Sequence, residues 1–187
     1  MPDRRELIVN ADDFGWSGSV NRGIIEAHRV GIVTSASILA TGEAFEDAAG
    51  LALATPSLSV GVHLSFYRGG TVQPPELLSA IMGSDGRFLG SWRRIVARLV
   101  VGSFDLHKLE DELRAQIERV RAAGLRPTHL DSEKHLHLWP PVFEVVCGLA
   151  VEYGIPAVRV VREPFGPRSV PRGLSLLSVW DARAVGA

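Results

Sequence analysis

The chain has 187 residues, enough for one domain with a substantial core, and we expect residues 1–187 to form that single domain. Its 46% hydrophobic and 22% charged residues are ordinary for a soluble globular protein, and the net charge of −1 favours neither nucleic acid nor an anionic membrane surface as a partner. The single cysteine, Cys147, excludes an internal disulfide and a cysteine-based zinc cluster. With no apolar run long enough for a membrane span and no signal peptide, the sequence predicts a cytoplasmic protein.

Segments with strand and helix character alternate from the N-terminus onward. Apolar or β-rich runs at 6–11, 32–40 and 57–66 predict strands. The segments 18–31 and 44–55, which lie between these runs, predict helices. The chain therefore begins as a series of strand–helix–strand units.

A long excursion, residues 68–92, follows the third strand and is rich in glycine and proline; long ordered loops commonly carry function. After it, residues 105–123 are the clearest predicted helix, because one apolar stripe recurs at spacings of three and four: Leu106, Leu109, Leu113, Ile117 and Val120. A fourth strand is predicted within 128–140, a helix over 142–154 and a fifth strand over 157–163. Strands separated by helices imply parallel pairing, either in an open doubly wound sheet or in a (β/α) barrel.

The fourth strand segment, "THLDSEKHLHLWP" at 128–140, holds three of the six histidines. Its histidines and acidic side chains all fall at odd positions and its leucines at even ones: His129, Asp131, Glu133, His135 and His137 against Leu130, Leu136 and Leu138. In an extended segment this alternation places the ionisable groups on one face. A solvated strand face usually carries lysine, glutamate and threonine, so imidazoles interleaved with carboxylates favour a metal or catalytic site.

Polar clusters fall at the ends of three predicted strands. Asp12 and Asp13 follow the first strand, His63 lies in the third, and the 129–137 group lies in the fourth. Parallel α/β folds gather active sites at the carboxyl ends of strands, so these clusters are predicted to converge on one divalent-metal site. Each cluster also has a simpler interpretation, since paired aspartates often form turns or caps and a lone histidine in an apolar strand is often a core residue.

Five stretches of the chain resemble one known family. "LIVNADDFG", "GIIEAHRVGIVTSASILA", "PSLSVGVHLSF", "DGRFLGSW" and "RPTHLDSEKHLHLWP" are similar to the YdjC-like carbohydrate deacetylases, in order and with comparable spacing, from about Glu6 to Val161. The resemblance implies a TIM-like (β/α) barrel of the polysaccharide-deacetylase type. It also implies one divalent ion, Mg²⁺ or Zn²⁺, and removal of an acetyl group from an N-acetylated amino sugar in an oligosaccharide or a glycolipid head group.

Roles for individual residues follow from the same resemblance. By position, Asp12 would be the general base, Asp13 the first metal ligand and His63 the second. The third ligand would be Glu133, which stands where the family usually has a histidine, or else His135; Glu133 is slightly favoured. His129 and Asp131 lie deeper in the strand and are expected to support the ligands from behind. Aromatic and imidazole side chains close to the clusters are the candidate substrate contacts: Phe14, Phe66, His137 and Trp139.

The C-terminal part departs from the family pattern. Five predicted strands are too few to close a barrel of this type, and no histidine follows Trp139, whereas family members carry a later histidine that is a candidate general acid. We therefore expect an incomplete barrel, a slow catalyst, and self-association into at least a dimer through the exposed sheet edge. The alternatives are a metal-dependent hydrolase of another bond and a non-catalytic carbohydrate- or metal-binding remnant.

Overall fold

The computed structural model describes residues 7–103 and 105–161. Within them, four strands form one all-parallel sheet in the order β1-β2-β3-β4, so that consecutive strands are neighbours in space. The strands are β1 (Asn10–Phe14), β2 (Ser35–Ile38), β3 (Ser59–Leu64) and β4 (Leu130–Ser132). The predicted α/β class with parallel pairing is thus confirmed.

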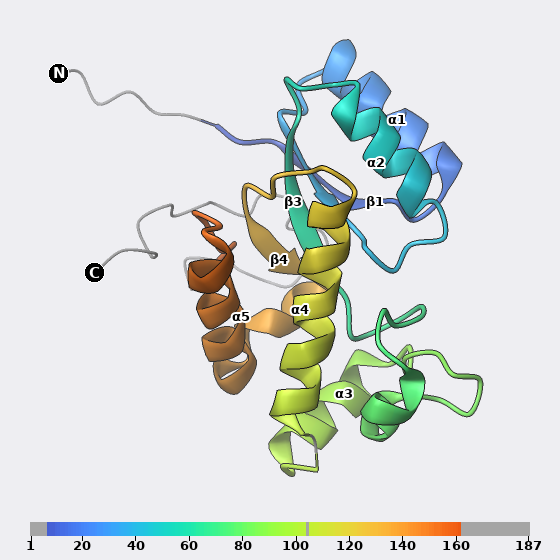
Figure 1. Cartoon of the computed structure of the whole chain (residues 1–187), viewed down its shortest axis with the longest axis vertical. Coiled ribbons are helices and arrows are strands. Elements are labelled where there is room, and N and C mark those ends of the chain that lie inside the picture. Colours follow the sequence, from blue (N-terminus) through green and yellow to red (C-terminus); the bar gives the residue numbers. More distant parts are fainter. Residues whose placement is uncertain (1–6, 104, 162–187) are drawn as a thin grey trace, which may run out of the picture.

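Helices make the connections between the strands (Figure 1). They are α1 (Gly18–Arg29), α2 (Phe45–Leu53), α3 (Trp92–Val100), α4 (Leu106–Ala122) and α5 (Pro140–Tyr153), with the 3-10 segments η1 (Pro75–Ile81) and η2 (Glu133–Leu138). Figure 1 shows α1 beside α2 and α4 beside α5, and both pairs are in contact. Right-handed crossovers between strands in sequential order place the connecting helices on one face of a sheet, which leaves the other face open for a site.

Strict alternation separates the two faces of the sheet. In β2 and β3 the even positions are apolar and belong to the buried core, namely Ala36, Ile38, Val60, Val62 and Leu64. This core also includes apolar side chains of the covering helices, such as Ile25, Leu113, Ile117 and Val146. The odd positions of the same strands carry serine, glycine and histidine instead. One face is therefore a hydrophobic core and the other is polar.

The helix predicted over 105–123 is confirmed as α4. Asp105 caps it, since its carboxylate accepts hydrogen bonds from the backbone N–H groups of His107 and Lys108. The predicted apolar stripe points into the core, where Leu109, Leu113, Ile117 and Val120 are fully buried. The other predicted helices form with bounds shifted by a few residues, as is usual for helix ends.

The first and the fifth predicted strands differ from the structure. The first strand, predicted over 6–11, forms only from Asn10 onward, while Leu7 and Ile8 are 71% and 44% exposed and residue 6 lies outside the described part of the chain. The fifth strand, predicted over 157–163, appears as a single parallel bridge between Val158 and Leu130, and residues 162–163 lie outside the described part of the chain.

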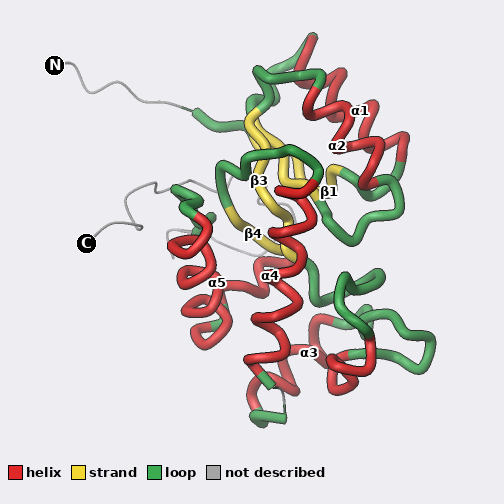
Figure 2. Tube along the Cα trace, in the orientation of Figure 1, coloured by secondary structure: helices red, strands yellow, loops and turns green. Residues whose placement is uncertain are grey.

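The excursion between β3 and α4 is ordered, and its buried side chains belong to the same hydrophobic core as the sheet. It contains η1, α3 and an antiparallel bridge between Met82 and Phe88, while Leu78, Ile81 and Ile95 are buried. Figure 2 shows it as a region of loops and short helices around α3, next to one end of α4. No helix of the described residues is long and apolar enough to cross a membrane.

Candidate active site

The carboxyl ends of β1, β3 and β4 meet at a cavity of about 320 Å³. Its lining comes from four separate segments: Asp12, Asp13, His63, Arg68, Ser132, Glu133, Lys134 and His135. The volume lies in the range of small-molecule sites. The structure therefore brings together the three polar clusters that the sequence predicts to converge.

The end of β1 turns both aspartates toward the cavity. The pairing of β1 with β2 is irregular between Ala11 and Phe14, and Asp13 has a φ of 65°, in the left-handed region that non-glycine residues rarely adopt. In a regular strand, neighbours such as Asp12 and Asp13 would point to opposite faces. The irregular backbone is the reason that both carboxylates line the same cavity.

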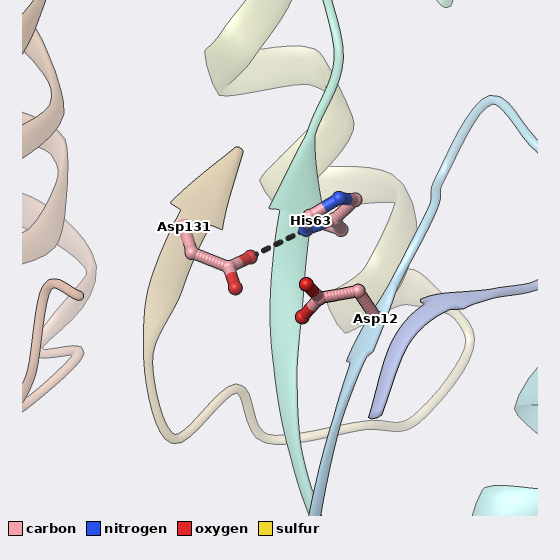
Figure 3. A group of neighbouring side chains, drawn as sticks. All are labelled: Asp12, His63 and Asp131. Carbon is pink, nitrogen blue, oxygen red and sulfur yellow. Dashed lines mark hydrogen bonds and ion pairs between the residues drawn. The ribbon is translucent and has the colours of Figure 1, made fainter. Parts of the chain in front are cut away.

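His63 is held in one orientation by a buried carboxylate. Its Nδ1 lies 2.7 Å from Asp131 Oδ1, and both side chains are almost completely buried (Figure 3). Nδ1 donates to this carboxylate, so Nε2 is directed to the other side, where Asp13 Oδ1 lies 3.8 Å away. Burial alone would lower the pKa of His63, but Asp131 and, more weakly, Asp12 and Asp13 raise this pKa to about 9.

Asp131 is the centre of a wider polar network on the open face of the sheet. Its Oδ2 accepts hydrogen bonds from Ser37 Oγ at 2.9 Å and from Arg159 Nη1 at 3.0 Å. The same Arg159 nitrogen lies 2.7 Å from Asp12 Oδ1, so one guanidinium joins the two carboxylates. Burial would raise the pKa of Asp131, but His63 and the other neighbouring cations hold it well below its usual range.

His129 supports this network from beneath. Its Nε2 lies 3.0 Å from Ser37 Oγ, and its ring crosses directly over Gly61, where an added Cβ would lie 2.3 Å from the imidazole. Glycine is thus required at position 61 for this close approach. Burial lowers the pKa of His129 to about 4, so the ring is neutral near neutral pH. His129 and Asp131 thus lie on the polar face of the sheet beside His63, and their expected role in supporting metal ligands stays a prediction.

Arg68, which the sequence prediction missed, crosses the mouth of the cavity. Its Nη2 lies 3.0 Å from each oxygen of Asp13, and its Nε donates to Glu133 Oε1. The guanidinium stacks on the ring of Trp16, 4.0 Å from the centroid. Ser65 Oγ donates to the other oxygen of Glu133, so both oxygens of that carboxylate already have partners.

The 128–140 segment is less extended than its alternation predicts. Only Leu130–Ser132 forms a strand, and η2 follows at once, with Lys134 and His135 at φ values of 54° and 53°. Glu133 and His135 still line the cavity, but this tight left-handed turn places them there rather than a continuous strand. The Nδ1 atom of His135 is buried and has no hydrogen-bond partner among the described residues.

His137 lies away from the cavity, which corrects its assignment to substrate contact. The backbone carbonyl of Arg159 accepts from its Nε2 at 2.8 Å, and its Nδ1 is 2.7 Å from Ser132 Oγ. A carbonyl can only accept, so Nε2 carries the proton and Nδ1 accepts from the serine. Burial lowers the pKa of His137 to about 4, consistent with this neutral, structural ring.

The aromatic candidates also need correction. Phe14 and Phe66 are 0% and 1% exposed and pack in the hydrophobic core, so neither ring is available to a sugar in this structure. Trp139 packs partly buried against the same core and does not line the cavity. Trp16 is instead the accessible aromatic beside the site, with 40% of its surface exposed and Arg68 on its face.

Three residues of the site had weak or no sequence signals. Ser37 alternates with the apolar positions of β2, and Arg159 alternates with valines in "AVRVV". This strand-like alternation predicts that both side chains lie on the polar face. Arg68 lies in an irregular loop where no periodicity applies.

A group of possible metal-ligand atoms from Asp12, His63 and Asp131, all within 4.8 Å of one another, also lies in this region.

Replacing Asp131 by asparagine should destabilise the metal-free protein by about 3–5 kcal/mol, the cost of removing one partner from a buried charged network. Arg159 and His63 would each lose a buried anionic partner. Urea unfolding in the presence of a chelator measures the change. The matched control is Glu43→Gln, which removes an 82% exposed carboxylate paired with Arg87 and should change stability by no more than about 0.5 kcal/mol.

The parent and Asp131→Asn should also differ in how their stability depends on pH. Because the pKa of His63 is raised from 6.5 to about 9 in the folded state, its contribution to stability is fully present below pH 6.5 and disappears as pH rises to about 9. The stability of the parent should fall over this window, and that of Asp131→Asn should fall much less. Parallel pH profiles for the two proteins would show that Asp131 does not hold the proton on His63.

The fold and the site define a parallel α/β protein with a carboxylate- and histidine-rich cavity at the carboxyl ends of its strands. Residues 6–183 match the YdjC-like protein family, and the chain belongs to that family. It is 42% identical to a carbohydrate deacetylase of Brevibacillus brevis over 92% of this chain and 66% of that protein. It is 44% identical to a chitooligosaccharide deacetylase of Klebsiella pneumoniae over 85% of this chain and 60% of that protein.

A solved structure supports the same relationship. A putative cellobiose-phosphate cleavage protein from Enterococcus faecalis matches with a TM-score of 0.74 and 32% identity, over 84% of this chain and 59% of that one. The chain thus spans about three fifths to two thirds of the length of these relatives. The resemblance that the sequence motifs indicate is confirmed at the level of the family.

Proposed function

We propose that this protein is a metal-dependent deacetylase that removes the acetyl group from an N-acetylated amino sugar. The observation that carries the proposal is the convergence of Asp12, Asp13 and oriented His63 at one cavity. Relatives named as carbohydrate and chitooligosaccharide deacetylases support the choice of substrate class. The sequential parallel strand order further supports our proposal that the sheet is part of a TIM-like (β/α) barrel.

The charges around the cavity fit a divalent cation. Four carboxylates line the cavity or lie directly behind it: those of Asp12, Asp13, Asp131 and Glu133. The cationic side chains in the same place are those of Arg68, Lys134 and Arg159. A negative charge therefore remains in excess when His63 is neutral. Carboxylate oxygens combined with imidazole nitrogens suit Zn²⁺, Mg²⁺ or Mn²⁺. We propose one such ion as the cofactor.

Asp13 and His63 are the proposed ligands. His63 donates from Nδ1 to Asp131, which is how proteins commonly orient a metal-binding imidazole, and its Nε2 remains for the ion. The separation of 3.8 Å between Nε2 and Asp13 Oδ1 is close to that of two ligands around one ion, each at about 2.0–2.2 Å from it. Asp131 already accepts from His63, Ser37 and Arg159, which makes it a supporting group rather than a ligand.

Asp12 is the proposed general base. Its Oδ1 accepts from Asn10 Nδ2 at 2.8 Å and from Arg159 Nη1 at 2.7 Å, whereas its Oδ2 accepts from none of the described residues. One oxygen thus fixes the carboxylate and the other is free to take the proton of an attacking water. A bound divalent ion would supply the activation of that water and the polarisation of the acetyl carbonyl.

Acetate release tests the proposed function directly. The purified protein, loaded with Zn²⁺ or Mg²⁺, is incubated with small oligomers of N-acetylglucosamine, and free acetate is measured with and without a chelator. We expect slow, chelator-sensitive release, and release at least about a hundredfold slower from Asp12→Asn under the same conditions. Sugar binding without acetate release would support a non-catalytic role, and cleavage of another bond would support a different hydrolase.

The identity of the third ligand can be tested by two substitutions. Both oxygens of Glu133 are occupied by Ser65 and Arg68, while His135 lines the cavity with its Nδ1 buried and unpartnered among the described residues. This reverses the preference drawn from the sequence. We expect His135→Ala to weaken metal binding more than Glu133→Ala does, as measured by calorimetric titration. The opposite ranking would assign the third ligand to Glu133.

A further inference from the structure

Arg68 occupies a position that a metal ion would need. Its Nη2 lies 3.0 Å from both oxygens of Asp13, in the bidentate position of that carboxylate. Asp13 Oδ1 is also the atom that lies 3.8 Å from His63 Nε2. A divalent ion bound between Asp13 and His63 would therefore share this carboxylate oxygen with the guanidinium of Arg68. Both groups are positively charged, so they would repel each other.

The backbone that carries Arg68 is firmly attached to α4. Gln116 bonds to both the N–H and the C=O of Ser65, and the buried carboxylate of Glu112 accepts from the N–H groups of Val72 and Gln73. These contacts fix both ends of the short loop. The Arg68 side chain is 35% exposed, so it can change its rotamer without moving the loop.

Two further contacts would keep the guanidinium close after it leaves Asp13. Its Nε donates to Glu133, and its plane stacks on Trp16 at 4.0 Å. Neither contact uses Asp13. The side chain can thus release the proposed metal ligand while Glu133 or Trp16 still holds it beside the cavity.

We propose that Arg68 is a resident cation that pairs with Asp13 in the metal-free protein and is displaced from it when the divalent ion binds. The inference rests on the metal site proposed above and adds a competitor to it. It also assigns Glu133 as the anchor of Arg68 rather than a metal ligand. Arg68 is in this view a positioning residue that sets how tightly the site holds its ion.

Metal affinity, not turnover, tests the inference. Calorimetric titration with Zn²⁺ and with Mn²⁺ is carried out on the parent, on Arg68→Gln and on Arg87→Gln. Loss of Arg68 removes both a competitor and a nearby positive charge, so we expect binding about tenfold tighter or more, equivalent to one or a few surface-type ion pairs. Arg87 pairs with Glu43 at 3.4 Å on the exposed surface, and its substitution should leave the affinity unchanged within about twofold.

A conservative variant covers the case in which Arg68→Gln folds poorly. Lysine keeps the charge but cannot make the forked contacts with Asp13 and Glu133, so Arg68→Lys should bind metal about twofold to fivefold more tightly than the parent. Circular dichroism confirms folding of each variant before titration.

The outcomes separate this inference from the proposed function. If the parent binds metal and the Arg68 variants bind it equally or more weakly, Arg68 supports the site and the inference is wrong, while the metal site stands. If only the Arg68 variants bind, the guanidinium blocks the site and the inference holds. If no protein binds, both the inference and the proposed metal dependence are wrong.

Discussion

Substitution of His63 by alanine should abolish stoichiometric binding of a divalent ion, and Asp13→Ala should do the same. These residues contribute the imidazole nitrogen and the carboxylate oxygen that face each other across 3.8 Å at the cavity. Loss of a residue that only supports a ligand weakens metal binding by up to about a hundredfold. Loss of a direct ligand should weaken it by more than that. Metal content after dialysis against Zn²⁺ and calorimetric titration both measure this.

Matched surface substitutions control for general effects. His107 and Asp111 are exposed on α4, away from the cavity lining, and provide the same residue types. His107→Ala and Asp111→Ala should bind metal like the parent. If His63→Ala and Asp13→Ala also retain full metal binding, the ion is held elsewhere and the proposed ligands are wrong.

Much of the site was predictable from local patterns because strands impose a period of two. The alternation of Val60, Val62 and Leu64 with Gly61 and His63 already shows which face of β3 is apolar. Parallel strands in sequential order then bring the ends of β1, β3 and β4 to one edge. These two rules are sufficient to predict that Asp12, His63 and Asp131 lie close together, without knowledge of any individual contact.

The same rules fail where the backbone leaves the regular strand. The positive φ angles of Asp13, Lys134 and His135 are set by tertiary contacts rather than by local preference, since each conformation is unfavourable for a non-glycine residue. Alternation alone would place Asp12 and Asp13 on opposite faces and would continue β4 through His137. Neither outcome is found, because irregular backbone at the strand ends redirects the side chains.

Arginine partners are the second kind of feature that sequence reasoning could not find. Arg68 pairs with residues 55 and 65 positions away, and Arg159 with residues 147 and 28 positions away. Long flexible side chains reach across elements, so their partners depend on the final packing and not on a local period. The cavity accordingly contains charge-compensating groups as well as the predicted acidic and imidazole side chains.

The second large effect is expected from Asp12→Asn. Asparagine has nearly the same size as aspartate and can still accept from Arg159 and Asn10 through its remaining oxygen, so the local hydrogen bonds are largely kept. The substitution removes the carboxylate that we propose takes the proton from water. In metal-loaded protein it should lower turnover by roughly two to four orders of magnitude, the usual contribution of a general base.

Metal content distinguishes this role from that of a ligand. If Asp12 is a base, Asp12→Asn should bind Zn²⁺ stoichiometrically and with nearly the parent affinity while acetate release is lost. If Asp12 instead coordinates the ion together with His63 and Asp131, whose possible ligand atoms lie within 4.8 Å of its own, the variant should lose metal and activity together. The second result would move the ion toward Arg159 and would leave Asp13 as the candidate base, because its carboxylate is the remaining acidic group beside His63 Nε2.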